Sequence, residues 1–251
     1  MRKPEYFDSP HGTRIAYHQL KGSNPGVIFL GGFMSDMDGG KALALEEHCR
    51  KAGRSFIRFD YQGHGASSGS FADGTIGLWT KDALAVIDYL TQGPQILVGS
   101  SMGGWTSLLC AKARPGRVKA FIGIAAAPDF TGRMWCDELD EAQRQTILHD
   151  GLVKVPTDYG PEPYILTKAL FDDGHKNRVV HETLHTDIPM RLIQGTDDPD
   201  VPWQTALHIA DMVKSEDVEV ILVPGGDHRL SEPNDLKRLI RIVEELADQI
   251  R

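Results

Sequence analysis

Cysteine is scarce in this chain: there are three among 251 residues, Cys49, Cys110 and Cys136. None belongs to a C-x-x-C pair, and the chain has no H-E-x-x-H segment, so neither of these metal-binding patterns is present. An odd number of irregularly spaced cysteines does not describe a disulfide framework. Because Cys49 and Cys110 lie in apolar, helix-like patterns, we expect both to be buried free thiols.

Long apolar runs and an excess of basic residues are also absent. No segment reaches the ~18 consecutive apolar residues that indicate a membrane span. The chain has 27 lysines and arginines against 35 aspartates and glutamates, a formal net charge of -8, whereas unspecific nucleic-acid binding depends on clustered basic side chains. The first residues, Met1–Glu5, do not lead into the apolar core of a signal peptide. We therefore expect a cytoplasmic protein with no membrane span and no nucleic-acid partner.

What is present is an ordinary globular composition, with 41% hydrophobic and 25% charged residues. Short apolar runs alternate with helix-like segments. Two extended runs at 5–8 and 13–20 predict an N-terminal antiparallel hairpin. The further predicted strands are 27–30, 56–60, 95–98, 118–126, 189–194 and 218–223, and the predicted helices are 40–52, 76–90, 102–113, 202–214 and 233–250. This alternation predicts an α/β fold with a mostly parallel, doubly wound sheet.

The alternation stops for about sixty residues before the strand at 189–194. A usual connection between strands is far shorter. The intervening stretch has no strong strand pattern and is rich in aromatic and charged residues. We interpret residues 129–188 as an inserted helical cap, and residues 1–128 and 189–251 as the core on which it rests.

The stretch Gln95–Gly104 joins an apolar strand, the pentapeptide G-S-S-M-G at 99–103 and a helical pattern. A serine between small residues in so tight a turn is the pattern of a nucleophile elbow, which places the hydroxyl at the N-terminus of the following helix. Alone, such a pentapeptide would arise by chance in about one chain in ten of this length. Ser101 is the expected nucleophile, since Ser100 occupies the variable position, where its side chain would point away from the cleft.

A serine hydroxyl needs a base to take its proton, and an acid to orient that base. In hydrolases with this elbow the chain order is serine, acid, histidine, each just after a strand. Asp198 and His228 satisfy that order after the predicted strands at 189–194 and 218–223. The position of these two residues turns a weak motif into a strong prediction.

Other residues compete for these roles. Asp197 and Asp200 are alternatives for the acid, although both also suit a turn or a helix N-cap. His64, between two glycines after a predicted strand, is the main alternative base, but it precedes Ser101 in the chain.

An oxyanion hole needs two N–H donors. One is expected from Met102, which follows the elbow serine. The other is expected from Phe33, in the glycine-rich loop 31–34 after the predicted strand at 27–30. The glycines of that loop allow the backbone to approach a substrate closely.

The segments G-S-S-M-G-G-W, F-D-Y-Q-G-H-G-A-S and G-T-D-D-P-D-V-P-W resemble those of serine α/β-hydrolases. In that family the acid commonly stands in G-x-x-D-x-x-V-P, which places it at Asp198, and the base in a G-x-H-like loop, matched loosely at His228. The segments K-A-L-A-L-E-E-H-C and D-V-E-V-I-L look similar to members that remove S-acyl groups from protein cysteines and hydrolyse acyl glucuronides. The resemblance covers the core well and the cap poorly. It implies Ser101, Asp198 and His228 as the triad, with Phe33 and Met102 at the oxyanion.

We therefore expect an α/β-hydrolase fold and a serine hydrolase of carboxylic esters or thioesters, acting through an acyl-enzyme on a small molecule or an acylated protein. It needs no cofactor and no metal. Met134, Trp135 and Trp203 are expected to contact the substrate. A carbon–carbon bond hydrolase with the same triad and a catalytically silent ligand-binding scaffold remain alternatives. Dehalogenases and epoxide hydrolases of this fold place an aspartate at the elbow, which here is Ser101.

Overall fold

The computed structural model describes residues 3–157 and 163–250, and its centre is an eight-stranded sheet in the order β1-β2-β4-β3-β5-β6-β9-β10. The antiparallel hairpin β1–β2 forms one edge, β2 pairs antiparallel with β4, and every further pair is parallel. The strands are β1 (Glu5–Asp8), β2 (Arg14–Leu20), β3 (Ser23–Leu30), β4 (Arg54–Phe59), β5 (Gln95–Ser100), β6 (Val118–Ile124), β9 (Met190–Gly195) and β10 (Val218–Val223). The predicted hairpin and doubly wound parallel sheet are thereby confirmed.

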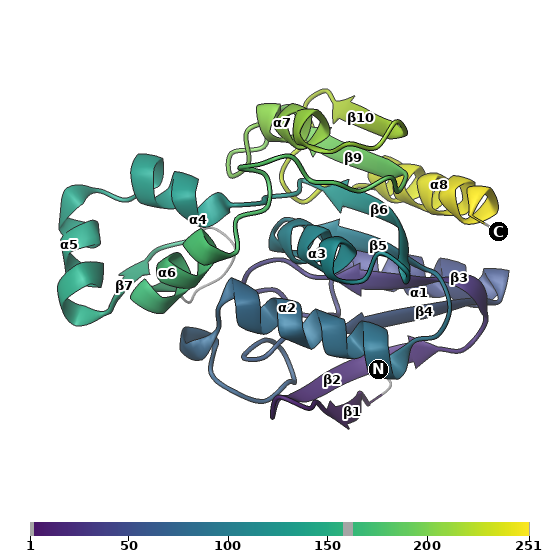
Figure 1. Cartoon of the computed structure of the whole chain (residues 1–251), viewed down its shortest axis with the longest axis horizontal. Helices are drawn as coiled ribbons and strands as arrows, with labels where there is room; N and C mark the ends of the chain where they lie inside the picture. The colour runs from purple at the N-terminus through teal and green to yellow at the C-terminus, as the bar shows by residue number, and fades with distance from the viewer. Residues whose placement is uncertain (1–2, 158–162, 251) are drawn as a thin grey trace.

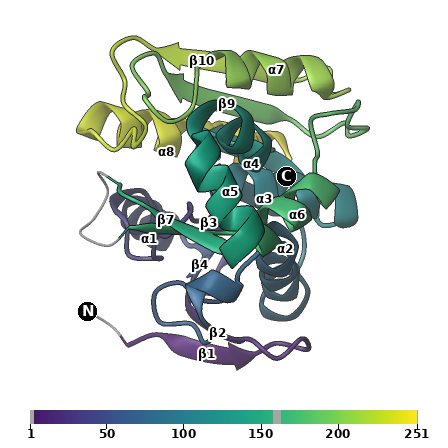
Figure 2. The ribbon, with the colours of Figure 1, turned by 90° about the vertical axis from the view of Figure 1, so that its left-hand side faces the viewer.

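Helices cover both faces of this sheet (Figures 1 and 2). On one face lie α1 (Gly40–Ala52) and α8 (Pro233–Gln249), and on the other α2 (Ile76–Ala85), α3 (Met102–Ala113) and α7 (Gln204–Met212). Strand β5 shows the alternation: Ile96 and Val98 pack under α1 and α8, and Leu97 packs on the opposite side. Because a central parallel strand is buried on both faces, its sequence is a continuous apolar run rather than an alternating one.

Two of the cysteines lie in these layers. Cys49 of α1 and Cys110 of α3 are fully buried and unpaired, as predicted. Burial raises the pKa of the Cys49 thiol to about 12 and raises that of Cys110 as well. A thiol that stays protonated is a poor nucleophile, so both residues serve the core as small apolar groups.

One predicted helix is divided. The segment 76–90 is α-helical to Ala85 and then forms a single π-helical turn, η2 (Val86–Leu90). The helix begins where Thr75 accepts a hydrogen bond from the backbone N–H of Leu78, a regular N-cap. The apolar spacing is compatible with either helix type, so the sequence did not distinguish them.

The insertion contains α4 (Phe130–Arg133), the π-helical turn η3 (Met134–Glu138), α5 (Glu141–Asp150), β7 (Leu152–Val155), β8 (Tyr164–Thr167) and α6 (Lys168–Lys176). Beside these helices the insertion holds a feature that the sequence did not predict, because β7 and β8 pair as an antiparallel two-stranded sheet. Four residues, L-V-K-V or Y-I-L-T, are too few to show a period of two clearly. The insertion projects from one end of the sheet (Figure 1). Its boundaries at 129 and 188 remain a prediction.

Candidate active site

Ser101 occupies the turn between β5 and α3 with a backbone geometry that side chains seldom adopt, φ 53° and ψ −118°. Hydrogen bonds fix this geometry from both sides. The Ser101 N–H donates to the Ile124 carbonyl at 2.9 Å, and its own carbonyl accepts from the N–H groups of Gly104 at 2.8 Å and Ala127 at 3.1 Å. The neighbouring strand β6 and the chain that follows it therefore constrain the serine.

The glycines around Ser101 are explained by close contacts. A Cβ atom on Gly103 would collide with the carbonyl oxygen of Leu30 and would lie 2.7 Å from that of Gly31. A Cβ atom on Gly104 would lie 2.5 Å from Cβ of Ala126. The start of α3 thus packs against the end of β3 and against the chain that follows β6 at a distance that only glycine permits.

Asp198 and His228 are in direct contact. Oδ2 of Asp198 lies 2.8 Å from Nδ1 of His228, and the Asp198 side chain is completely buried while that of His228 is 15% exposed. Burial by itself would raise the pKa of the Asp198 carboxyl, but the hydrogen bond and charge of His228, with two backbone N–H groups, outweigh it and lower the pKa. An ionised carboxylate accepts the Nδ1 proton, and this makes Nε2 of His228 the unprotonated, basic nitrogen.

The Asp198 carboxylate has its other acceptor positions filled. Oδ1 accepts from the backbone N–H groups of Asp200 and Val201, both at 2.9 Å, and Oδ2 also accepts from Nε2 of Gln194 at 2.8 Å. Asp198, Asp200 and His228 bring possible ligand atoms within 4.8 Å of one another. Because four N–H groups already engage Asp198, its chemistry favours an orienting carboxylate over a metal ligand.

Backbone hydrogen bonds join the acid and histidine loops. The N–H of Thr196 donates to the Val223 carbonyl, and that of Asp197 to the Gly226 carbonyl, both at 3.0 Å. On the other side, the Ala125 N–H donates to the Ile193 carbonyl at 2.8 Å. The loops after β6, β9 and β10 are thus hydrogen-bonded to one another or to the adjoining strands at the carboxyl edge of the sheet, where β5 also ends, just before Ser101.

The alternative acids and base lie in different surroundings. Asp200 has a carboxylate oxygen 4.0 Å from Nδ1 of His228, but its side chain is 42% exposed. Asp197 accepts a hydrogen bond from the neighbouring Thr196 hydroxyl. His64 is only 3% exposed, its ring lies against three aromatic side chains, and burial lowers its pKa to about 4. Its Nδ1 faces the carbonyl of Gln62 instead of an acid.

The glycine-rich loop 31–34 lies beside the elbow, since a Cβ atom on Gly32 would be 3.4 Å from Cβ of Ser101. Among the described residues, neither the Phe33 N–H nor the Met102 N–H has a hydrogen-bond acceptor. Two unoccupied donors are what an oxyanion requires.

The Phe33 ring has a role that the sequence did not indicate. It makes edge-to-face contacts with Phe71, Trp79, Phe130 and Tyr164, at centroid distances of 4.8, 5.8, 5.8 and 5.3 Å. Two of these rings belong to the core and two to the predicted cap. Phe33 therefore follows the glycine that approaches Ser101, and its side chain lies against the insertion.

The residues predicted to contact substrate come from two separate elements. Met134 and Trp135 are half-buried in η3, and the Trp135 ring packs on Phe171 at 5.0 Å. Trp203 stands at the N-cap of α7. Their contact with substrate remains a prediction.

Sequence reasoning missed two supporting side chains. Gln194 is buried at the end of β9, and its amide donates to both Asp198 and the Val201 carbonyl. A polar residue ending an apolar strand was the available signal. Lys41, at the start of α1, donates from Nζ to the carbonyl of Arg229, next to His228, and burial lowers its pKa to about 8.

A mostly parallel eight-stranded sheet with a strained serine turn after a central strand is the architecture of an α/β-hydrolase. The model of the family described as "alpha/beta hydrolase fold" matches residues 25–150, half of the chain. The chain belongs to this family.

Individual proteins that are more similar to this chain indicate which reaction it catalyses. The chain is 41% identical to rat "Palmitoyl-protein thioesterase ABHD10, mitochondrial", over 98% of this chain and 82% of that protein. Mouse α/β-hydrolase domain-containing protein 10 has a solved structure with TM-score 0.92 and 39% identity, covering 100% of both chains. A solved putative hydrolase from Agrobacterium vitis has TM-score 0.93 and 38% identity, covering 98% of each. With these relationships the chain is a hydrolase of carboxylic esters or thioesters.

The same comparisons correct one expectation. The relatives from rat, cow, mouse and human are all named as mitochondrial proteins. The cytoplasmic prediction was therefore wrong. It rested on charge composition and on finding neither a long apolar run nor a signal-peptide core, and none of these observations identifies a compartment. No helix in the described part of the chain is long and apolar enough to span a membrane.

Proposed function

We propose that this chain is an S-acyl-protein thioesterase that works through an acyl-enzyme on Ser101. The observation that carries the proposal is the 2.8 Å contact between the buried Asp198 carboxylate and His228, in a chain 41% identical to a palmitoyl-protein thioesterase. The substrate is a fatty-acyl thioester of a protein cysteine, and the products are a carboxylic acid and the free thiol.

In the first half-reaction Ser101 Oγ attacks the thioester carbonyl while Nε2 of His228 takes the hydroxyl proton. Asp198 keeps Nδ1 protonated and stabilises the imidazolium that forms. The N–H groups of Phe33 and Met102 donate to the oxyanion, and each such donor contributes roughly 100- to 1000-fold in kcat. The C–S bond then breaks, and the departing sulfur takes the proton from His228.

The second half-reaction repeats these roles with water. His228 removes a proton from water as it attacks the ester on Ser101, and the proton returns to Oγ as the carboxylic acid leaves. Every proton removed by His228 is given back within the cycle, so the chemistry needs no cofactor.

We further propose that residues 129–188 form a cap that selects the acyl group, with Met134, Trp135 and Trp203 among the contacts. Support comes from the aromatic side chains Phe130 and Tyr164, which reach the Phe33 ring beside the predicted oxyanion donors. Trp135→Ala is expected to change the preferred acyl chain length. Leu148→Ala, at a 51% exposed position in the same insertion, is the matched control.

The proposal is tested with a fluorophosphonate label and an S-palmitoylated peptide. We expect the label on the peptide containing Ser101, and Ser101→Ala to lower turnover of the thioester at least about 1000-fold. Ser100→Ala, one position away, should retain turnover within tenfold. Labelling at another residue, or an equal loss of turnover in Ser101→Ala and Ser100→Ala, would contradict the assignment of Ser101 as the nucleophile. A panel with the oxygen ester and a vinylogous diketone distinguishes thioester preference from general esterase or carbon–carbon hydrolase activity.

A further inference from the structure

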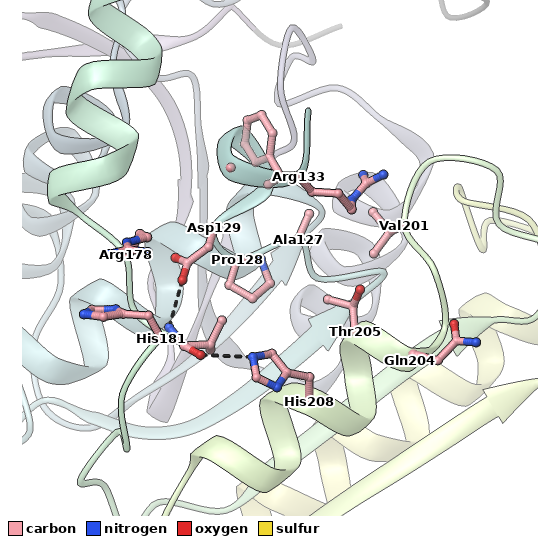
Figure 3. Close-up of a pocket in the computed structure, with 13 residues that line it drawn as sticks. Ala127, Pro128, Asp129, Arg133, Arg178, His181, Val201, Gln204, Thr205 and His208 are labelled. Carbon is pink, nitrogen blue, oxygen red and sulfur yellow. Dashed lines mark hydrogen bonds between the residues drawn. The ribbon is translucent and has the colours of Figure 1, made fainter. Parts of the chain in front are cut away.

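A cavity lies between the connection from β6 to α4, the segment after α6 and the first turns of α7 (Figure 3). Its volume is about 460 Å³, within the about 300–1,000 Å³ of typical small-molecule pockets. Neither Ser101 nor His228 is among its lining residues. It is therefore a site apart from the predicted triad.

The floor of this cavity is apolar and its rim is basic. Buried side chains form the floor: Ala127, Phe130, Val180 and Val201, together with Pro128. The rim carries four basic side chains, Arg133, Arg178, His181 and His208. In a chain of net charge -8 this concentration of basic groups favours an anionic ligand with an apolar body.

The single acidic residue of the lining, Asp129, does not neutralise this rim completely. Its carboxylate accepts from the backbone N–H of Val179 at 2.8 Å. It also accepts from the backbone N–H of Val180 at 3.1 Å (Figure 3). Burial raises the pKa of Asp129, and the charges of His181 and Arg178 oppose this rise only in part. Among the described residues, neither of these two basic side chains has a hydrogen bond or ion pair, so their N–H groups remain free for a ligand.

The other two basic residues are already engaged. Nε2 of His208 lies 3.0 Å from the Val180 carbonyl oxygen. The Arg133 guanidinium pairs with Glu138 and donates to the Asp200 carbonyl. Arg178 and His181 are therefore the residues that would bind the anionic group, while Arg133 and His208 shape the site.

The cavity walls are bonded directly to the candidate active site. Ala127 donates its N–H to the Ser101 carbonyl, and Val201 donates its N–H to Asp198. Arg133 contacts the backbone of Asp200, whose carboxylate is near His228. A ligand in the cavity would therefore contact segments whose backbone hydrogen bonds position Ser101 and Asp198.

We propose that this cavity binds a monocarboxylic acid with an apolar body, with the carboxylate between Arg178 and His181 and the body on the floor formed by Phe130, Val180 and Val201. Hydrolysis of an ester or thioester releases an acid of this kind, so the ligand's source rests on the proposed function, whereas the site itself does not.

The probe is a decanoic acid carrying a photoreactive diazirine, used on the full chain. We expect cross-links in peptides that contain residues 127–133, 178–181 or 201–208. In equilibrium dialysis with decanoate, Arg178→Gln combined with His181→Gln should weaken binding at least tenfold. Lys176→Gln, at an exposed position on the adjoining helix end and outside the lining, should change it less than twofold.

Decanol, which lacks the charge, should bind at least tenfold more weakly than decanoate. Cross-links confined to the peptides of Ser101 and His228, equal affinity of the double variant and the Lys176→Gln control, or equal binding of decanol would each overturn the proposal. Turnover of Ser101→Ala is measured separately, so a failure of the catalytic proposal is distinguished from a failure of this site.

Discussion

Asp200 places a carboxylate oxygen 4.0 Å from Nδ1 of His228, the atom that Asp198 contacts at 2.8 Å. The two carboxylates differ in environment, because Asp198 is fully buried and Asp200 is 42% exposed. Asp200 thus provides a weaker, solvent-screened negative charge next to the same imidazole. In the absence of Asp198, Asp200 would still place a carboxylate near the His228 imidazole.

Substitution of Asp198 should reveal how much the Asp200 carboxylate contributes to catalysis. We expect Asp198→Asn to lower kcat about 10³- to 10⁴-fold, because the amide no longer favours the Nδ1-protonated imidazole. Asp200→Asn alone should cost less than tenfold. Adding Asp200→Asn to Asp198→Asn should lower kcat by a further factor of about ten. Equal rates for Asp198→Asn and the double variant would show that Asp200 contributes nothing.

The crossing of α3 and β3 can be tested at Gly103. Gly103→Ala would place a methyl group against the carbonyls of Leu30 and Gly31, and we expect it to lower the free energy of unfolding by about 3 kcal/mol or more and to abolish turnover. Gly116→Ala is the control, since a Cβ atom there meets nothing within 4 Å. Urea denaturation measures both variants, and similar stability for the two would contradict this explanation of the glycine.

His64 should make the protein sensitive to mild acid. Burial lowers its pKa from 6.5 to about 4, so between these values the unfolded chain binds a proton that the folded chain does not. Stability therefore falls as the pH decreases from 6.5 to 4, by up to about 1.4 kcal/mol per pH unit and about 3 kcal/mol in all. His64→Gln should flatten this part of the profile.

The control for that experiment is His149→Gln. His149 is an exposed histidine of α5 paired with Asp150. The free energy of unfolding is followed by denaturant titration at each pH. A His64→Gln profile parallel to that of the unsubstituted protein would exclude His64 as the source of the acid sensitivity.

The contact between Phe33 and Tyr164 should couple the oxyanion loop to the insertion. A double-mutant cycle with Phe33→Leu and Tyr164→Leu is expected to give an interaction energy of about 0.5–1.5 kcal/mol, the usual range for an edge-to-face pair. The pair Phe7 and Tyr89, which stacks at the surface with Tyr89 61% exposed, is the comparison, and its loss should leave kcat unchanged. Additive effects of the two leucines on both stability and kcat would show that the rings are independent.

The sequence was informative where local pattern and position in the sheet coincide. Ser101, Asp198 and His228 could be selected because each follows an apolar strand, and parallel strands end at one edge. The orientation of the Asp198 carboxylate depends on Gln194 and on two backbone N–H groups, which no spacing rule indicates.

Contacts between distant segments could not be predicted. The β7–β8 hairpin is too short to leave a clear periodicity. The aromatic rings around Phe33 come from four separate stretches of chain, and the basic rim joins Arg133, Arg178 and His208 from three. Such groupings arise from the path of the chain in space and not from local sequence.

The left-handed backbone at Ser101 has a consequence for the design of variants. Geometry of this kind costs a non-glycine residue about 1–3 kcal/mol. Ser101→Gly should therefore give a more stable but inactive protein, whereas Ser101→Ala keeps the Cβ and most of the strain. At position 101 thermal selection and selection for turnover would favour different amino acids, so a screen for heat resistance alone would tend to discard the residue on which the proposed chemistry depends.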